Sequence, residues 1–99
     1  MVAGLLELEL FLPHSRSLKE KRQHVRSLTH KIRNKFHLSV AEVDYQDLWQ
    51  RSLVGVSCVA QDVAHAREIL SSVLRWSEAK WEGDIVGSHL HYYSTKEEF

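Results

Sequence analysis

The sequence is poor in the residues that mark disulfide-bonded, nucleotide-binding and metal-binding proteins. Its 99 residues include one cysteine, one proline and four glycines. The single thiol, Cys58, cannot form an internal disulfide, which indicates a reducing compartment, and we expect the cytoplasm. No glycine-rich phosphate loop, C-x-x-C pair or H-E-x-x-H motif occurs. The common signatures of nucleotide, redox and zinc-protease chemistry are therefore excluded.

Long hydrophobic runs are also missing. No run of about 18 apolar residues occurs, so we expect no membrane-spanning helix. Glu7 and Glu9 interrupt the apolar N-terminal segment, and no basic residue precedes it, unlike a signal peptide. With 43% hydrophobic and 26% charged residues, the composition is globular. We therefore expect one domain over residues 1–93 and a short flexible tail over residues 94–99.

Charge is balanced over the whole chain but concentrated in one segment. The formal net charge is zero, yet residues 15–36 hold eight of the thirteen Lys and Arg residues against one acid, Glu20. The segment also has the pattern of a helix over residues 18–36, opened by an S-x-x-E capping box of Ser17 and Glu20. Its apolar residues share one face. They are Leu18, Val25, Leu28, Ile32 and Phe36.

Basic side chains form a continuous flank beside this apolar stripe. We use the term basic ridge for four of these residues, Lys19, Arg22, Arg26 and Arg33. Either the ridge is a solvated face balanced by acids on neighbouring elements, or it binds the phosphates of RNA or DNA and releases their counterions. An anionic membrane surface is a third candidate, but the helix has no second apolar face for it.

The remaining patterns predict four strands and a second helix. Asp62 is a helix N-cap, and Gly83 ends that helix. The order βαββαβ predicts an α+β ferredoxin-like sandwich, with a four-stranded antiparallel sheet of order 4-1-3-2 and two helices on one face. The other face stays open and carries Leu5 and Phe11, so we expect a homodimer. The expected strands are 2–12, 38–45, 53–60 and 84–92, and the expected second helix is 63–80.

Three segments resemble the YlxP-like family of small bacterial proteins of unknown function. They are GLLELELFLPHSRSLKEKR, SVAEVDYQDLWQR and DVAHAREILSSVLRW, within a resemblance that spans residues 1–93. The resemblance implies a ferredoxin-like fold that is often dimeric and has no established activity. Genes of the family commonly lie among translation and ribosome-maturation genes, which favours an RNA-related role. The chain departs from the family after Trp81, where His89 and His91 replace a more acidic ending.

Two further clusters could carry chemistry. His89 and His91 share one face of the last strand, next to Glu7 and Glu9 on the first. They are either zinc-type ligands or cross-strand Glu–His pairs, and we expect the pairs, no metal and no cofactor. The second cluster lies in the connection over residues 44–51 and is a candidate partner or ligand site. Its residues are Asp44, Gln46, Asp47, Trp49 and Gln50.

Within that connection we expect Trp49 to anchor against the sheet edge, with Asp47 and the glutamines fixing the turn or meeting a partner subunit. Glu42, Asp44 and Asp47 could act as acid–base carboxylates, but no nucleophile is grouped with them. The strand over residues 53–60 has no aromatic residue, so base stacking on the sheet, as in RNA-recognition modules, is not expected.

Our hypothesis is therefore a non-enzymatic accessory protein that binds RNA or a ribosomal subunit through the basic ridge. The alternative is a homodimeric protein-interaction or ligand-binding module that uses the open sheet face and the 44–51 connection. A small enzyme comes third, and the sequence indicates no small-molecule substrate.

Overall fold

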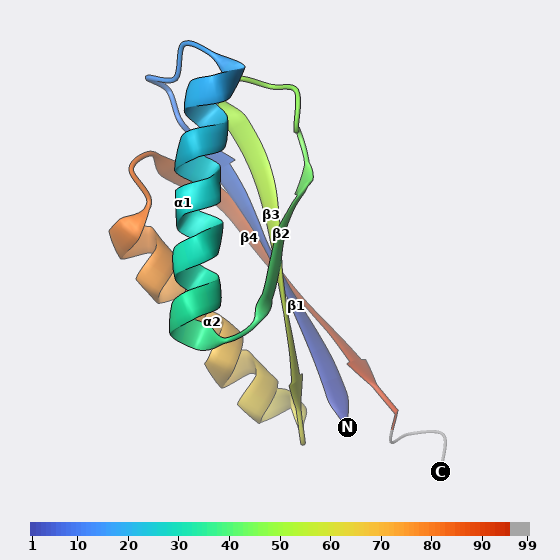
Figure 1. The fold of residues 1–99 in the computed structure, drawn as a ribbon. Coiled ribbons are helices and arrows are strands. Elements are labelled where there is room, and N and C mark those ends of the chain that lie inside the picture. Colours follow the sequence, from blue (N-terminus) through green and yellow to red (C-terminus); the bar gives the residue numbers. More distant parts are fainter. Residues whose placement is uncertain (96–99) are drawn as a thin grey trace.

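Six elements follow one another in the order βαββαβ (Figure 1) in the computed structural model, which describes residues 1–95. They are β1 (Val2–Phe11), α1 (Leu18–Phe36), β2 (Ser39–Asp44), β3 (Arg51–Ala60), α2 (Val63–Lys80) and β4 (Asp84–Ser94). The expected tail starts inside β4, because Ser94 pairs with Val2 in the sheet. Thr95 then donates its backbone N–H to Met1 O at 3.1 Å, and residues 96–99 lie outside the described chain.

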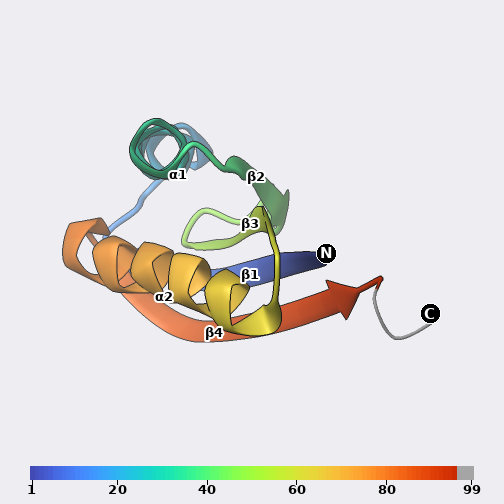
Figure 2. The ribbon, with the colours of Figure 1, turned by 90° about the horizontal axis from the view of Figure 1, so that it is seen from below.

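The four strands form one antiparallel sheet in the order β2-β3-β1-β4, which confirms the predicted ferredoxin-like topology. Figure 2 shows both helices on the same side of this sheet. The start of α1 and the connection between β2 and β3 lie at one end of the molecule, and the N-terminus lies at the other (Figure 1). Neither helix is long and apolar enough to cross a membrane.

Alternation along β1 separates the two faces of the sheet. Leu6, Leu8 and Leu10 point to the helices and are fully buried, because successive side chains of a strand leave on opposite faces. Leu5 and Glu7 point to the open face. The buried residues of β3 and of both helices complete one core on the helix side. Within residues 1–95, no helix or strand covers the open face.

Both helices begin at the predicted caps. The backbone N–H of Glu20 donates to Ser17 Oγ at 3.0 Å, and that of His65 donates to Asp62 Oδ1 at 2.8 Å. These bonds satisfy donors that the first turn of a helix leaves free. The carboxylate of Glu20 accepts from the Arg16 N–H at 3.2 Å rather than from the Ser17 N–H of a standard capping box.

Candidate nucleic-acid interface

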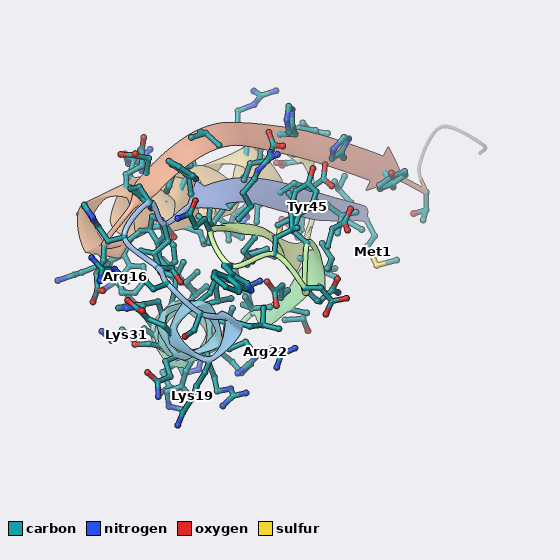
Figure 3. The ribbon with its side chains drawn as sticks, turned by 90° about the horizontal axis from the view of Figure 1, so that it is seen from above. Met1, Arg16, Lys19, Arg22, Lys31 and Tyr45 are labelled. Atoms are coloured by element: carbon teal, nitrogen blue, oxygen red, sulfur yellow. The ribbon has the colours of Figure 1, made fainter. Side chains whose placement is uncertain are left out.

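The basic ridge is exposed along α1, as the sequence predicts. All four of its residues are exposed to solvent. In the view down α1, Lys19 lies on the side away from the sheet, with Arg22 on one flank and Lys31 on the other (Figure 3). Arg33 differs from the rest because its guanidinium donates to Val40 O on β2 at 2.8 Å. Arg33 therefore also fixes the end of α1 against the sheet.

Carboxylates near α1 are bound to other partners and leave the ridge unpaired. Arg22 and Arg26 line a shallow cleft of about 210 Å³ that Glu42 also lines, but Glu42 pairs with Lys21. Within residues 1–95, no carboxylate lies within 4.0 Å of a basic nitrogen of the ridge. The contacts between basic and acidic side chains found there are the Lys21–Glu42 ion pair and three histidine–glutamate contacts, His24–Glu82, His89–Glu9 and His91–Glu7. Within residues 1–95, direct contacts with acidic side chains of neighbouring elements therefore do not balance the positive charge of the ridge.

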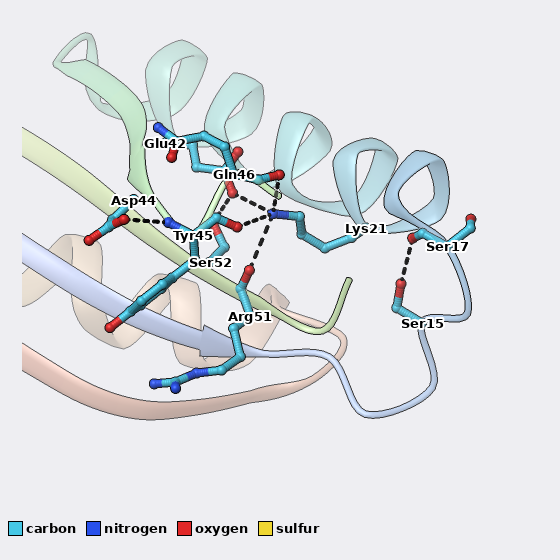
Figure 4. A network of polar contacts seen from close by, with 9 residues as sticks. All are labelled: Ser15, Ser17, Lys21, Glu42, Asp44, Tyr45, Gln46, Arg51 and Ser52. Carbon is cyan, nitrogen blue, oxygen red and sulfur yellow. Dashed lines mark hydrogen bonds and ion pairs between the residues drawn. The ribbon is translucent and has the colours of Figure 1, made fainter. Parts of the chain in front are cut away.

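Lys21 belongs to the same basic segment but lies in the interior, with 1% of its side chain exposed. Its ammonium group donates to Glu42 Oε2 at 2.8 Å (Figure 4). It also reaches three backbone carbonyls, those of Tyr45 at 2.9 Å, Arg51 at 3.2 Å and Gln46 at 3.3 Å. The hydroxyl of Ser52 donates to the same Glu42 oxygen at 2.6 Å. Glu42 is therefore a structural ion-pair partner, and Lys21 ties α1 to the 44–51 connection.

Further contacts of its own residues fix the 44–51 connection in place. Asp44 Oδ1 accepts from the Tyr45 N–H at 2.7 Å, at a position where Tyr45 has a left-handed φ of 62°. The guanidinium of Arg51 lies 4.8 Å from the centre of the Tyr45 ring. Gln50 Nε2 donates to Pro13 O at 3.1 Å and to Ser15 O at 3.2 Å. Asp44 and Gln50 therefore shape the turn. This role was expected for Gln50, together with Asp47 and Gln46, but not for Asp44.

Trp49 corrects one expectation. It was expected to anchor against the sheet edge, but 57% of it is exposed, and the neighbouring Leu48 is 44% exposed. The position beneath the connection is taken by the Lys21 ammonium, which fills it with hydrogen bonds to backbone carbonyls. The side chains of Gln46 and Asp47 are exposed as well. All five candidate residues in this cluster are thus exposed, and two of them, Asp44 and Gln50, also make side-chain hydrogen bonds within the chain.

An apolar trough of about 560 Å³ crosses the open face of the sheet. Its small residues lie on β2 and β3, and larger side chains line it from β1, β2 and β4. We use the term trough for the hollow lined by Leu5, Ala41, Val43, Gly55, Ser57 and Tyr93. The sequence pattern gave the open face but not the hollow, because depth depends on which residues of four strands become neighbours.

The Glu–His cluster lies on this same face. His91 Nε2 is 2.9 Å from Glu7 Oε1, and His89 Nε2 is 3.5 Å from Glu9 Oε2. Each histidine thus contacts one glutamate, in the manner of the cross-strand pairs that the sequence suggested. In the described chain, no group of three or more His, Cys, Asp or Glu side chains is placed to hold a metal ion.

The fold and these surfaces define a class, the small ferredoxin-like α+β proteins with one cationic helix and an open sheet face. The chain belongs to the family described as "Protein of unknown function (DUF503)", whose sequence profile matches residues 3–90. It is 33% identical over 76 residues to "Uncharacterized protein YlxP" of Bacillus subtilis (strain 168), a match that covers 77% of this chain and 83% of that protein. The predicted resemblance is confirmed.

Among solved structures, the "De novo designed protein Ferredog-Diesel" is similar in shape, with a TM-score of 0.44 and 12% sequence identity. The match covers 93% of this chain and 84% of the designed chain.

Proposed function

We propose that this protein is a non-enzymatic accessory protein that binds RNA, in the setting of the ribosome, through the basic ridge on α1. The observation that carries the proposal is a row of exposed cations without carboxylate contacts, while the nearby Glu42 and Glu82 are bound to Lys21 and His24. Such cations bind phosphates favourably because the nucleic acid then releases its condensed counterions. The RNA-related gene context of the family supports an RNA target.

The geometry favours contacts to the RNA backbone over contacts to particular bases. The ridge runs along the exposed side of a 19-residue helix, which spans about 28 Å at the usual rise per residue. Phosphates repeat along such a length, so several ridge residues can engage one strand. Contacts of this kind position an RNA without specifying its sequence. We therefore expect affinity that depends on salt and only weakly on sequence.

The test is the binding of a fluorescent structured RNA and of ribosomal subunits, titrated from low to moderate salt. The wild type is compared with the double variant Arg22→Glu/Arg26→Glu. The control is Arg75→Glu/Lys80→Glu, which makes the same change of charge on exposed positions of α2. We expect wild-type affinity to fall linearly with salt on logarithmic axes. The ridge variant should lose at least about tenfold relative to the control.

Two results would overturn the proposal. One is a wild type that binds neither RNA nor subunits at low salt. The other is an equal loss in the ridge variant and in the α2 control, which would assign binding to net charge alone. Vesicles of anionic lipid serve as a third probe. Tight binding to vesicles with none to RNA would move the function to a membrane surface.

We infer a second candidate function, self-association through the trough on the open sheet face. Exposed apolar side chains, including Val43 at 51% exposure, lie around a floor of small residues there. The occupant that fits is a second copy of the chain. Glu7 and Glu9 are already paired with histidines, so the contact brings no unpaired carboxylates together. The helices lie on the other face, so both basic ridges stay outward and do not repel across the contact.

This second function is tested by the molar mass in solution, measured by sedimentation over a range of concentrations. Val43→Glu places a charge in the trough, and we expect it to yield monomers. Val86→Glu is the matched control, since Val86 is 56% exposed and does not line the trough. A wild type that stays monomeric at high concentration would exclude self-association, and dissociation by both variants alike would place the contact elsewhere.

A further inference from the structure

Leu48 and Trp49 form an exposed apolar tip on the 44–51 connection. Both are more than two-fifths exposed, at 44% and 57%. Large aromatic side chains are usually mostly buried, because each removes a large apolar area from water. An adjacent exposed leucine and tryptophan at a loop tip therefore need an explanation that the packing of this chain does not provide.

The tip is held in place from both sides. Lys21 binds the carbonyls of Tyr45 and Gln46 before the tip and of Arg51 after it. The Leu48 N–H donates to Tyr45 O at 3.1 Å and closes the turn within the connection. Since the flanking backbone is fixed before any partner arrives, ordering of the tip adds little entropic cost to binding.

The contacts of Lys21 and Gln50 join the connection that carries the tip to segments that also carry the exposed cations Arg22 and Arg16. Lys21 directly precedes Arg22 of the basic ridge, so the residue that holds the connection is next to a ridge residue. Gln50 directly follows Trp49 and is bound to Ser15 O, next to the exposed Arg16. Figure 1 shows the connection and the start of α1 at the same end of the molecule. Figure 3 shows Arg16 and Arg22 on either side of the helix.

We propose that Trp49 is a stacking platform for an unpaired base of the bound RNA, with phosphates of the same strand held by Arg22 and its cationic neighbours. This inference rests on the proposed function and names its substrate class, an RNA with a single-stranded loop or bulge. An indole face stacks on any base. Protein cations that contact the neighbouring phosphates of the RNA complete the usual site for a single strand. β3 offers no aromatic residue for this purpose.

The experiment uses two RNAs of equal length and charge, one a fully paired duplex and one with an unpaired bulge of several nucleotides. The full-length wild type is compared with Trp49→Leu, which keeps an apolar side chain without an aromatic face, and with Trp49→Phe, which keeps a ring. Circular dichroism melts check that each variant is folded. Because Trp49 is largely exposed, we expect these melts to change little.

We expect Trp49→Leu to lose about 5- to 150-fold in affinity for the bulged RNA, the equivalent of one stacked base, and little for the duplex. Trp49→Phe should recover most of that loss. The salt dependence should stay unchanged in both variants, because the phosphate contacts remain. In contrast, Arg22→Glu/Arg26→Glu should weaken both RNAs and reduce the salt dependence.

The outcomes separate this inference from the proposed function. Equal affinity of Trp49→Leu and wild type for the bulged RNA, with the ridge variant still defective, would overturn the stacking role and leave the ridge as an RNA site. An equal loss on both RNAs, or no recovery by Trp49→Phe, would also overturn stacking on an unpaired base. Absence of wild-type binding to either RNA would overturn both proposals.

Discussion

Lys21 shows how a single residue can carry a structural role inside a segment that reads as a charged surface. A lysine with 1% exposure has lost nearly all its contact with water, which is costly unless every ammonium hydrogen finds an acceptor. Here one carboxylate and three backbone carbonyls supply the acceptors (Figure 4). Those carbonyls belong to the 44–51 connection, and the Lys21 ammonium donates to each of them. The lysine and the connection therefore stabilise each other.

We predict that Lys21→Met destabilises the protein by about 3–5 kcal/mol, because the change leaves the Glu42 charge without its cationic partner and removes a donor from three backbone carbonyls. The double variant Lys21→Met/Glu42→Met should be less destabilised than the single one, since no charge is left unpaired. Urea unfolding followed by tryptophan fluorescence measures both. Lys31→Met, at an exposed position of α1, serves as the control and should change stability by less than about 0.5 kcal/mol.

Cys58 leads to a prediction about pH. Burial raises the pKa of its thiol above the ordinary 9.0, because desolvation disfavours the thiolate, while a hydrogen bond from the Gly4 backbone acts in the opposite direction. The unfolded chain thus releases the thiol proton at a lower pH than the folded chain. The stabilisation is present below pH about 9 and is lost as the pH rises above it. The urea midpoint of unfolding should fall between pH about 8 and pH about 10, and it should fall further in the wild type than in Cys58→Ala. An equal fall in both proteins would contradict this.

The sequence carried more information about some residues than about others. Lys21 lies on the apolar side of the helix at 100° per residue, so its burial was readable from the periodicity once charge was set aside. Trp49 had no such signal, because a connection has no period and its side chains are placed by contacts from elsewhere. An exposed tryptophan and an anchoring one look the same in sequence. The structure was needed to separate them.

At the scale of elements, helices were better defined by sequence than strands. Both helices have the predicted bounds, since Ser17 and Asp62 mark the starts and the apolar periodicity marks the length, but Trp81 in an extended conformation, and not Gly83, ends α2. The strands start or end one or two residues away from the predicted positions at five of their eight ends. Register shifts at Glu9/Leu10 and at Glu42/Asp44 alter the pairing there, and neither shift changes the alternation pattern enough to be recognised in advance.

The cap of α2 provides the prediction at this scale. Asp62 accepts from the His65 N–H, and the first turn of α2 has no other acidic residue. Asp62→Ala should therefore destabilise the protein by about 0.5–2 kcal/mol, whereas Asp62→Asn should cost much less, because an amide oxygen also accepts at this position. Urea unfolding followed by circular dichroism measures both. Gln61→Ala, at the neighbouring exposed position, is the control, and an equal effect there would show that the cap is not responsible.

For the whole molecule, the ferredoxin-like plan separates two surfaces by the thickness of the fold. The helices and their cations occupy one side of the sheet, and the trough occupies the other. A contact between two copies through the trough would therefore not cover either basic ridge. The two proposed functions are compatible in one particle, and together they would make a bivalent binder of RNA.

This bivalency gives the last prediction, which concerns RNAs that carry two binding sites on a flexible linker. A dimer that engages both sites binds the second at a high effective concentration, so its affinity for a two-site RNA exceeds that for a one-site RNA. Val43→Glu, which we expect to separate the copies, should lower affinity for the two-site RNA by about 10- to 100-fold more than for the one-site RNA. Val86→Glu adds the same charge outside the trough and should affect both RNAs equally. If Val43→Glu also affects both RNAs equally while the wild type is dimeric, the two ridges do not act together, and self-association serves a purpose other than RNA binding.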